Sequence, residues 1–345
     1  MNLNAKNLLK RFKKIDVESI QDDSLREKAR KLKSKQGGFT LLELLVVVAI
    51  LAAIAGTATI ALQDTDARAS AAAHVAMMDE LNKGIHTFRV LNKNQFPDTF
   101  DSMLGVDLTT DGNAAAATFP ANELVAIEDA GTIALTADTV TALNDIGISS
   151  LQYLDYGNAA DLDGDGDTTD CAAANVVDTI ASRANAVVSN NIFMTPAANG
   201  CGGNQTLAAG DQVLVWTGGY ERVLGAAGVP FDGLGGPTLG TGTPGEAITV
   251  GADTTPVLML VGLGPSSTLF NTNDLGGMTT VPVYRHVSET QYGRFAAVFN
   301  IGTFNAATAG GYDTADQITF ITVIDGAGDT KEEELGEWDG TRNTI

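Results

Sequence analysis

The sequence predicts an α+β protein in which one long N-terminal helix packs on an antiparallel β-sheet head. Two observations indicate the helix: no proline occurs between Phe39 and Phe96, and apolar residues recur at helical spacing beyond residue 62. A third observation indicates the sheet, because short runs of β-branched and aromatic residues alternate with glycine-rich turns after residue 210.

Charge separates the first residues from the rest of the chain. Residues 1–38 carry 11 basic and 5 acidic side chains, whereas residues 39–345 carry 10 basic and 37 acidic ones. This second part has a net charge of −27 and would repel phosphate backbones. We therefore expect no nucleic-acid partner.

An apolar run of 22 residues, from Leu41 to Leu62, follows the basic leader. As a helix it is long enough to cross a hydrocarbon core of about 30 Å, and the basic leader predicts a cytoplasmic N-terminus and an exported body. The one charge in the run, Glu43, is either a functional carboxylate or a group in the headgroup zone. The competing interpretation is a secretory signal that is cut at Ala53-Ile54-Ala55.

The junction before the run carries a specific motif, in which Gly37-Gly38 precedes Phe39-Thr40-Leu41-Leu42-Glu43. This motif closely resembles the class III signal of type IV pilins and type II secretion pseudopilins. The resemblance covers roughly residues 33–62, although the leader is long for the commonest subclass. It implies that a prepilin peptidase cuts after Gly38, that Phe39 is then N-methylated, and that Glu43 is the characteristic glutamate of the family.

The resemblance also implies how such subunits assemble. In a helical stack, the Glu43 carboxylate of one subunit can meet the Phe39 amine of its neighbour. Each charge alone is costly in hydrocarbon, and pairing offsets that cost, so the pair fixes the axial register of the stack. The implied partners are the same or related pilin subunits, the prepilin peptidase/methyltransferase and an inner-membrane assembly platform.

Four segments follow from these patterns. They are a cytoplasmic prepilin leader at 1–38, a transmembrane half-helix at 39–62, a soluble half-helix at 63–92, and a globular α+β head with a calcium loop at 93–345. The soluble half carries an apolar seam: Ala67, Ala71, His74, Met78, Leu81, Ile85 and Phe88. We interpret His74 as a packing residue, and Asn92-Lys93-Asn94 as the end of the helix.

Within the head, Asp98–Leu104 is expected to be a short helical turn. Residues 105–210 are expected to form a long loop region with short helices around Glu123–Glu128 and Val176–Val188. The predicted strands are Val213–Trp216, Val257–Val261, Val281–Tyr284, Phe295–Phe299 and Ile318–Ile324. The run Lys331-Glu332-Glu333-Glu334 is expected to be a solvated surface.

The head contains one metal-type motif, five carboxylates within ten residues: Asp161, Asp163, Asp165, Asp167 and Asp170. Their alternation, with Gly166 at the sixth position, matches the first half of a calcium loop. The twelfth position is Ala172 rather than a bidentate Glu, so Asp170 or Asp155 would have to replace that ligand. We expect Ca²⁺ here, the alternative being a solvated acidic turn.

The two cysteines, Cys171 and Cys201, match no zinc pattern and have no His nearby. A disulfide formed outside the cytoplasm is the preferred interpretation, and two free thiols are the alternative. No HExxH, GxSxG or phosphate-loop pattern occurs, so we expect no enzyme.

The leading hypothesis is a structural subunit of a type IV pilus-like filament. The subunit would be held in the inner membrane as a single-pass protein and then become part of an extracytoplasmic filament, in the periplasm or at the cell surface. A minor or major pseudopilin of a type II secretion system is the first alternative. A secreted calcium-dependent adhesin or binding module is the alternative from another class.

Overall fold

The computed structural model describes two compact units, Met1–Ala67 and Arg68–Ile345, and each is described by itself. The description leaves out residues 1–13, 15, 35–40, 118–129, 160, 162–165, 167, 170, 172–199, 217–237, 240–247, 250–255, 285–286, 288–291, 306, 309 and 340–345. It also leaves out the side chains of residues 32–34, 41–42, 58–68, 238–239, 248–249 and 337–339.

The first unit contains a short 3-10 turn, η1 (Val17–Ser19), and the helix α2 (Asp23–Ser34). Arg30 of α2 pairs with Glu18 of η1, which ties these two elements together. Over the described parts of the chain, no helix combines the length and the apolarity that a membrane crossing requires.

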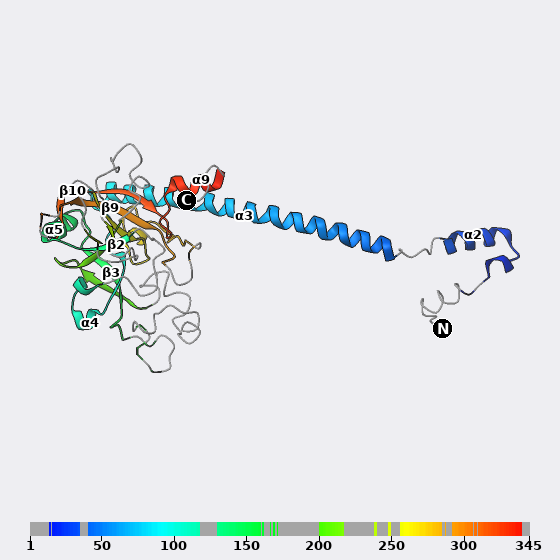
Figure 1. The fold of residues 1–345 in the computed structure, drawn as a ribbon, viewed down its shortest axis with the longest axis horizontal. Helices are drawn as coiled ribbons and strands as arrows, with labels where there is room; N and C mark the ends of the chain where they lie inside the picture. The colour runs from blue at the N-terminus through cyan, green and yellow to red at the C-terminus, as the bar shows by residue number, and fades with distance from the viewer. Residues whose placement is uncertain are drawn as a thin grey trace. The chain divides into compact units, whose positions relative to one another are not determined.

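The predicted long helix is confirmed as α3, which runs from Leu41 to Leu91 without a break (Figure 1). It ends where the sequence predicts, because Lys93 and Asn94 adopt left-handed backbone conformations with φ of 56° and 72°. The amide of Asn94 bonds to the carbonyl of Arg89 at 2.8 Å, which closes the last turn.

The apolar seam of α3 is also confirmed over the second unit. Its described members are all buried: Ala71, His74, Met78, Leu81, Ile85 and Phe88. From Met78 onward these apolar side chains belong to the same core as the sheet, which explains why a 3.6-residue period is kept along this part of the helix.

The head is built on one large sheet whose main path runs β10-β9-β8-β1-β3-β4. The strands of this path are β1 (Phe100–Val106), β3 (Ser150–Asp155), β4 (Gly202–Thr206), β8 (Pro256–Gly262), β9 (Ala296–Phe304) and β10 (Tyr312–Ile324). The expectation of a purely antiparallel sheet is wrong, because β1 and β3 pair in parallel. The fold is therefore α+β with a mixed sheet.

Two further strands attach beside β8. β5 (Gln212–Trp216) pairs with β8 at Leu260, and β2 (Ala130–Ala134) pairs with β5. β1 joins β8 only through Asp101 and Gly262, at the end of β8. Two short strands, β6 (Thr238–Leu239) and β7 (Ile248–Thr249), form a separate ladder.

The rest of the head consists of short connecting elements. They are α4 (Leu108–Asp111), η2 (Ala114–Ala116), α5 (Ala137–Asp145), η3 (Thr268–Phe270) and the C-terminal α9 (Lys331–Asp339). In Figure 1, α9 lies along α3, and α5 lies at the end of β10.

The short helical turn expected at Asp98–Leu104 is wrong, since β1 begins at Phe100. The Asp98 carboxylate accepts hydrogen bonds from the amides of Ser149 and Ser150, at 2.9 and 3.0 Å. These bonds hold the chain beside β3, so pairing with a distant segment overrides the local turn signal.

The loop expected at 105–210 contains β2, α5, β3 and β4 in its described parts. The helices expected at Glu123–Glu128 and Val176–Val188 lie outside the described residues. Val281–Tyr284 is not a strand. Its carbonyls at Val281 and Pro282 instead accept hydrogen bonds from the guanidinium of Arg294.

Candidate functional site

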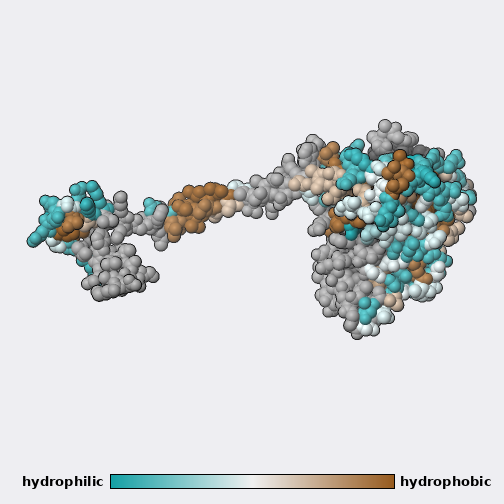
Figure 2. All heavy atoms as spheres, turned by 180° about the vertical axis from the view of Figure 1, so that it is seen from behind, coloured by the Kyte–Doolittle hydropathy of each residue, from teal (hydrophilic) through white to brown (hydrophobic). Residues whose placement is uncertain are grey.

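The most unusual surface of the first unit is the apolar part of α3. Eight large apolar side chains between residues 44 and 54 are 43–62% exposed: Leu44, Leu45, Val46, Val47, Val48, Ile50, Leu51 and Ile54. Figure 2 shows them as a continuous hydrophobic band on the helix. Folded proteins rarely expose so contiguous an apolar surface unless another surface covers it.

The predicted assembly residue Glu43 lies in the first turn of α3, directly before this band, and its side chain is exposed. The carboxylate is well placed there, because the unpaired amides at a helix N-terminus favour negative charge. The predicted processing residues Gly38 and Phe39 lie outside the described residues.

The second predicted site is the acidic loop. Of its five aspartates the structure describes Asp161, whose carboxylate accepts a hydrogen bond from the Gly166 amide at 3.1 Å. Gly166 has φ +91°, a conformation that glycine adopts without strain. Asp163, Asp165, Asp167 and Asp170 lie outside the described residues. Asp155 is one of the two residues that could replace the missing twelfth ligand. One oxygen of its carboxylate accepts hydrogen bonds from the backbone amides of Leu108 and Gly157.

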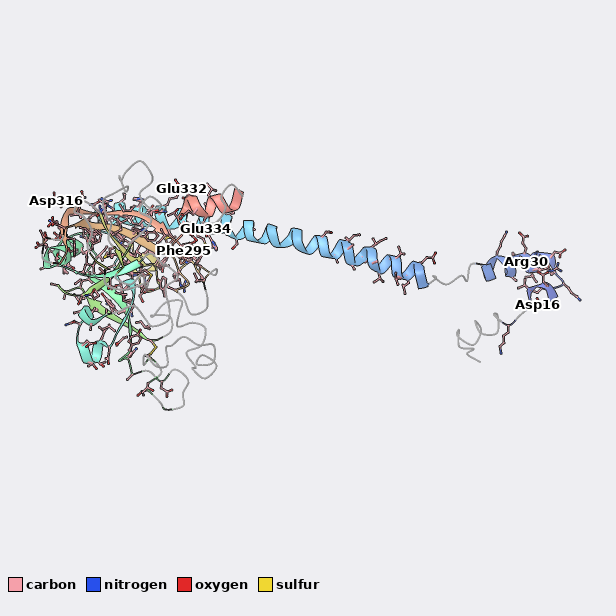
Figure 3. The ribbon with its side chains drawn as sticks, viewed as in Figure 1. Asp16, Arg30, Phe295, Asp316, Glu332 and Glu334 are labelled. Carbon is pink, nitrogen blue, oxygen red and sulfur yellow. A yellow bond between two sulfur atoms is a disulfide. The ribbon has the colours of Figure 1, made fainter. Side chains whose placement is uncertain are left out.

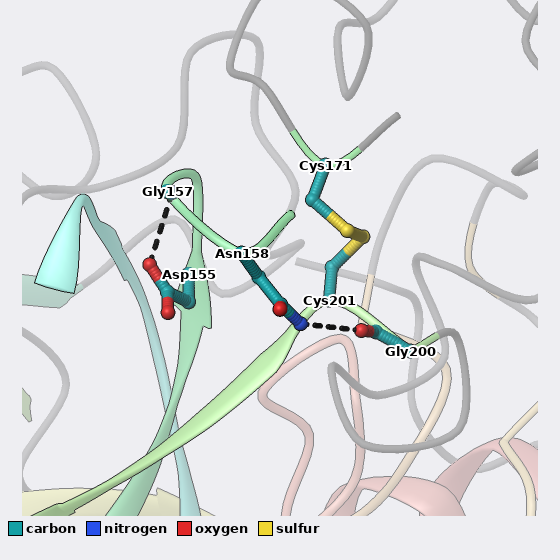
Figure 4. Close-up of a disulfide and its surroundings, with 6 residues drawn as sticks. All are labelled: Asp155, Gly157, Asn158, Cys171, Gly200 and Cys201. Carbon is teal, nitrogen blue, oxygen red and sulfur yellow. Dashed lines mark hydrogen bonds between the residues drawn. A yellow bond between two sulfur atoms is a disulfide. The ribbon is translucent and has the colours of Figure 1, made fainter. Parts of the chain in front are cut away.

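Cys171 and Cys201 form a disulfide that closes the segment after this loop (Figure 4). Both cysteines are fully buried. The side-chain Nδ2 of Asn158 donates to the carbonyl of Gly200 at 2.7 Å, beside the disulfide. The turn after β3, the start of β4 and Cys171, which follows the acidic residues, are thus held together at one place.

A third group of carboxylates was missed by the sequence analysis. Asp325 follows β10, Asp329 lies in the next turn, and Glu334 comes from α9. One carboxylate oxygen from each lies within 4.8 Å of the others. We call these three residues the C-terminal acidic cluster. Figure 3 labels Glu334 on the inner side of α9 and Glu332 on the outer, exposed side.

The solvated surface expected at Lys331–Glu334 is therefore wrong in part, because Glu333 and Glu334 are only 7% and 3% exposed. The carboxylate of Glu333 accepts from the amide and the hydroxyl of Thr330, at 2.9 and 3.1 Å. The bond from the Thr330 amide is one half of a capping box, and the Thr-x-x-Glu spacing was a signal for α9 in the sequence.

The surroundings of the C-terminal acidic cluster are apolar and aromatic. Burial raises the pKa of Asp325 to about 8, with the nearby carboxylates of Glu334 and Asp329 adding to the shift. Burial and the charge of Asp325 raise the pKa of Tyr284 as well. The His74 ring of α3 lies 4.7 Å from the Tyr284 ring, centroid to centroid, at a tilt of 55°, and its Nδ1 lies 3.4 Å from Glu334 Oε1. His74 is therefore buried on the apolar seam, as expected, and it also lies beside the carboxylate of Glu334.

The N-terminal segment of the chain is similar to a known protein family. Residues 33–59 match the family model of the prokaryotic N-terminal methylation motif. The chain carries a type IV prepilin signal. The matched segment contains Gly38, Phe39, Glu43 and the whole exposed apolar band. No curated protein and no solved structure matches the chain.

The prepilin signal supports a pilin-like or pseudopilin-like subunit, and it implies related pilin subunits and a prepilin peptidase as partners. Such a role is structural rather than enzymatic. The motif ends at residue 59 and therefore carries no information on the function of the head.

Proposed function

We propose that this chain is a structural subunit of a type IV pilus-like filament, cut after Gly38, N-methylated at Phe39 and polymerised through α3. The observation that carries the proposal is the prepilin signal directly before a helix with a band of exposed apolar side chains. Stacking such helices in a filament keeps that band out of water, where it would be exposed at a cost of about 25 cal/mol per Å² of apolar surface.

Before assembly, the segment 39–62 anchors the subunit in the inner membrane. This step is supported by the basic leader and by the apolar run Leu41–Leu62, which contains a single charge. After assembly, the same segment lies in the filament interior, and the head faces outward. The exchange of lipid for neighbouring helices keeps the apolar band covered throughout.

Glu43 sets the register between neighbouring subunits. Its position in the first turn of α3, four residues after Phe39, brings the carboxylate close to the level at which a neighbour's new amine would lie. An ion pair in apolar surroundings adds little net stability but is costly to break from one side. The Glu43–Phe39 pair therefore selects one axial offset.

We also propose that Ca²⁺ binds the Asp161–Asp170 loop and orders it. The alternating carboxylates and the turn at Gly166 support this, and the adjoining disulfide restrains the same region. The signal alone is shared by pili and type II secretion pseudopili, so a pseudopilin of that system is the alternative within the same class.

The test of the proposed function is Glu43→Ala in cells that have no wild-type copy. We expect normal membrane insertion, because a charge is removed from the apolar run, but a loss of filaments. The matched control is Glu80→Ala, which removes an exposed glutamate of the same helix within the head. Wild-type filament yield from Glu43→Ala would contradict the pairing of Glu43 with the neighbouring amine.

A further inference from the structure

The leader contains a folded element that filament assembly does not use. η1 and α2 contact each other, and Val17 of η1 and Ala29 of α2 are only 8% and 9% exposed. The Asp22 carboxylate caps the start of α2 by accepting from the amide of Ser24 at 2.9 Å. Because cleavage after Gly38 removes this element, its role belongs to the precursor.

Charge is divided sharply along this element. Residues 16–25 carry four acidic and no basic side chains, whereas residues 26–35 carry six basic and one acidic side chain. We call residues 26–35 the basic segment, and its net charge is +5. The positive end of the element is therefore the end that leads into the apolar run of α3.

Ion pairs within the element do not remove this charge. The described pairs are Arg26 with Asp23, Arg30 with Glu18, and Lys31 with Glu27. The side chains of the last two pairs are 60–72% exposed, so water screens them and they are weak. Lys28 is exposed and forms no ion pair within the described residues. The basic segment therefore still attracts an anionic surface.

One face of α2 is left open by the contact with η1. Leu25 is 55% exposed, and the exposed Lys28 lies three positions further along the same side of the helix. An exposed leucine beside lysines suits the boundary between lipid headgroups and acyl chains, because the leucine enters the apolar layer while the ammonium groups stay among the headgroups.

The covalent chain limits how far α2 can lie from the membrane. α2 ends at Ser34 and α3 begins at Leu41, so six residues separate them. Even fully extended, that connection spans no more than about 25 Å. This step rests on the proposed function, which places segment 39–62 in the inner membrane. The basic segment then lies within reach of the headgroups.

We propose that the basic segment of the precursor binds anionic phospholipid headgroups on the cytoplasmic surface of the inner membrane, with the Leu25–Lys28 face of α2 toward the lipid. Clusters of about four to eight Lys and Arg beside the cytoplasmic end of a membrane span are typical of such binding. Gly38 lies three residues after Lys35, so the contact holds the cut site at the membrane surface, and cleavage ends the contact.

The experiment uses the full-length precursor from cells that lack the prepilin peptidase, reconstituted into vesicles of phosphatidylcholine with or without phosphatidylglycerol. Cys171 and Cys201 pair with each other, so Leu25→Cys supplies a free thiol for a fluorescent label. Acrylamide, a neutral quencher present on both sides of the vesicles, measures the exposure of the label to water. We expect quenching to fall when phosphatidylglycerol is present and to recover in high salt, which screens the charges.

Paired charge variants test whether the basic segment causes this protection. Lys28→Gln with Lys31→Gln removes two exposed charges from α2, keeps good helix formers and should abolish the protection. The matched control, Lys83→Gln with Lys93→Gln, removes two exposed charges from the head and should keep it. Equal quenching of the Leu25 label in neutral and anionic vesicles, or equal protection in both double variants, would overturn the proposal.

A second label separates this proposal from the membrane anchor. Val48→Cys places the label within the apolar run. If the Val48 label is shielded from acrylamide while the Leu25 label is quenched equally in both kinds of vesicle, the anchor stands and the lipid contact of the leader is overturned. If the Val48 label is itself open to acrylamide in both kinds of vesicle, the anchor fails, and the lipid contact is overturned with it.

Discussion

Lys331 on α9 donates a hydrogen bond of 2.6 Å to the Asp79 carboxylate on α3. This pair joins the C-terminal helix to the long helix, but the two side chains remain 41% and 38% exposed. Water therefore screens it, and such pairs contribute about 0.2–1 kcal/mol. Two residues along α3, Leu81 is fully buried in the core. Packing rather than the ion pair should hold α3 on the head.

We predict that Leu81→Ala lowers the free energy of unfolding by about 2–5 kcal/mol, because it leaves a cavity in the core. Lys331→Ala should lower it by less than about 1 kcal/mol. Urea unfolding of the full chain in detergent, followed by tryptophan fluorescence, measures both. A loss from Lys331→Ala as large as that from Leu81→Ala would show that the ion pair dominates the contact.

The sequence predicts α3 well because its signals are local. The uninterrupted, proline-free stretch predicts where the helix begins and ends, and the regular apolar seam predicts which face is buried. The strands β5 and β8 are likewise found within one or two residues, since runs such as Val257–Val261 have strong β propensity.

The sequence does not predict elements that depend on distant partners. β4 begins with Gly202-Gly203 and has little β propensity, yet it pairs with β3 along its length. A Cβ on Gly203 would lie 2.6 Å from Leu108 Cδ1 and 3.0 Å from Asp155 Cβ, so a larger residue there would require these side chains to shift. The burial of Glu334 is also a tertiary property, because its local sequence is typical of a solvated surface.

The disulfide gives the second stability prediction. Replacing both Cys171 and Cys201 by Ala should lower the free energy of unfolding by about 2–5 kcal/mol, because the unfolded chain regains the freedom of a 30-residue loop. Thermal melts with and without reductant measure this. The reductant should lower the melting temperature of the wild type and leave the double variant unchanged. A wild type insensitive to full reduction would contradict a stabilising role.

The Asp161 loop gives the third prediction. Calcium at a hundredfold excess over its dissociation constant should stabilise the chain by about 2.7 kcal/mol, and magnesium should substitute poorly because it dehydrates reluctantly. Asp163→Ala should remove the calcium-dependent rise in melting temperature.

The matched control for that loop is Asp316→Ala, which removes an exposed aspartate of β10 (Figure 3). It should leave the calcium dependence unchanged. If calcium and chelator give the same melting curve for the oxidised wild-type chain, the loop is an acidic turn that binds no calcium.

Processing gives the fourth prediction. Gly38→Val should block cleavage, because a β-branched side chain replaces a hydrogen at the peptidase site. Immunoblotting of cell extracts should then show only the precursor. Gly56→Ala is the control, since a Cβ at Gly56 meets no atom within 4 Å and the helix tolerates it. Mature protein accumulating in Gly38→Val would contradict the assigned cut site.

The N-terminus of the mature chain tests the filament assignment most directly. Intact mass and N-terminal sequencing of protein extracted from its own cells, from membranes or sheared filaments, determine it. We predict a chain that begins at Phe39 and carries one additional methyl group on its amine. A chain that retains Met1, or one that begins after Ala55 as a secretory signal would require, contradicts the assignment.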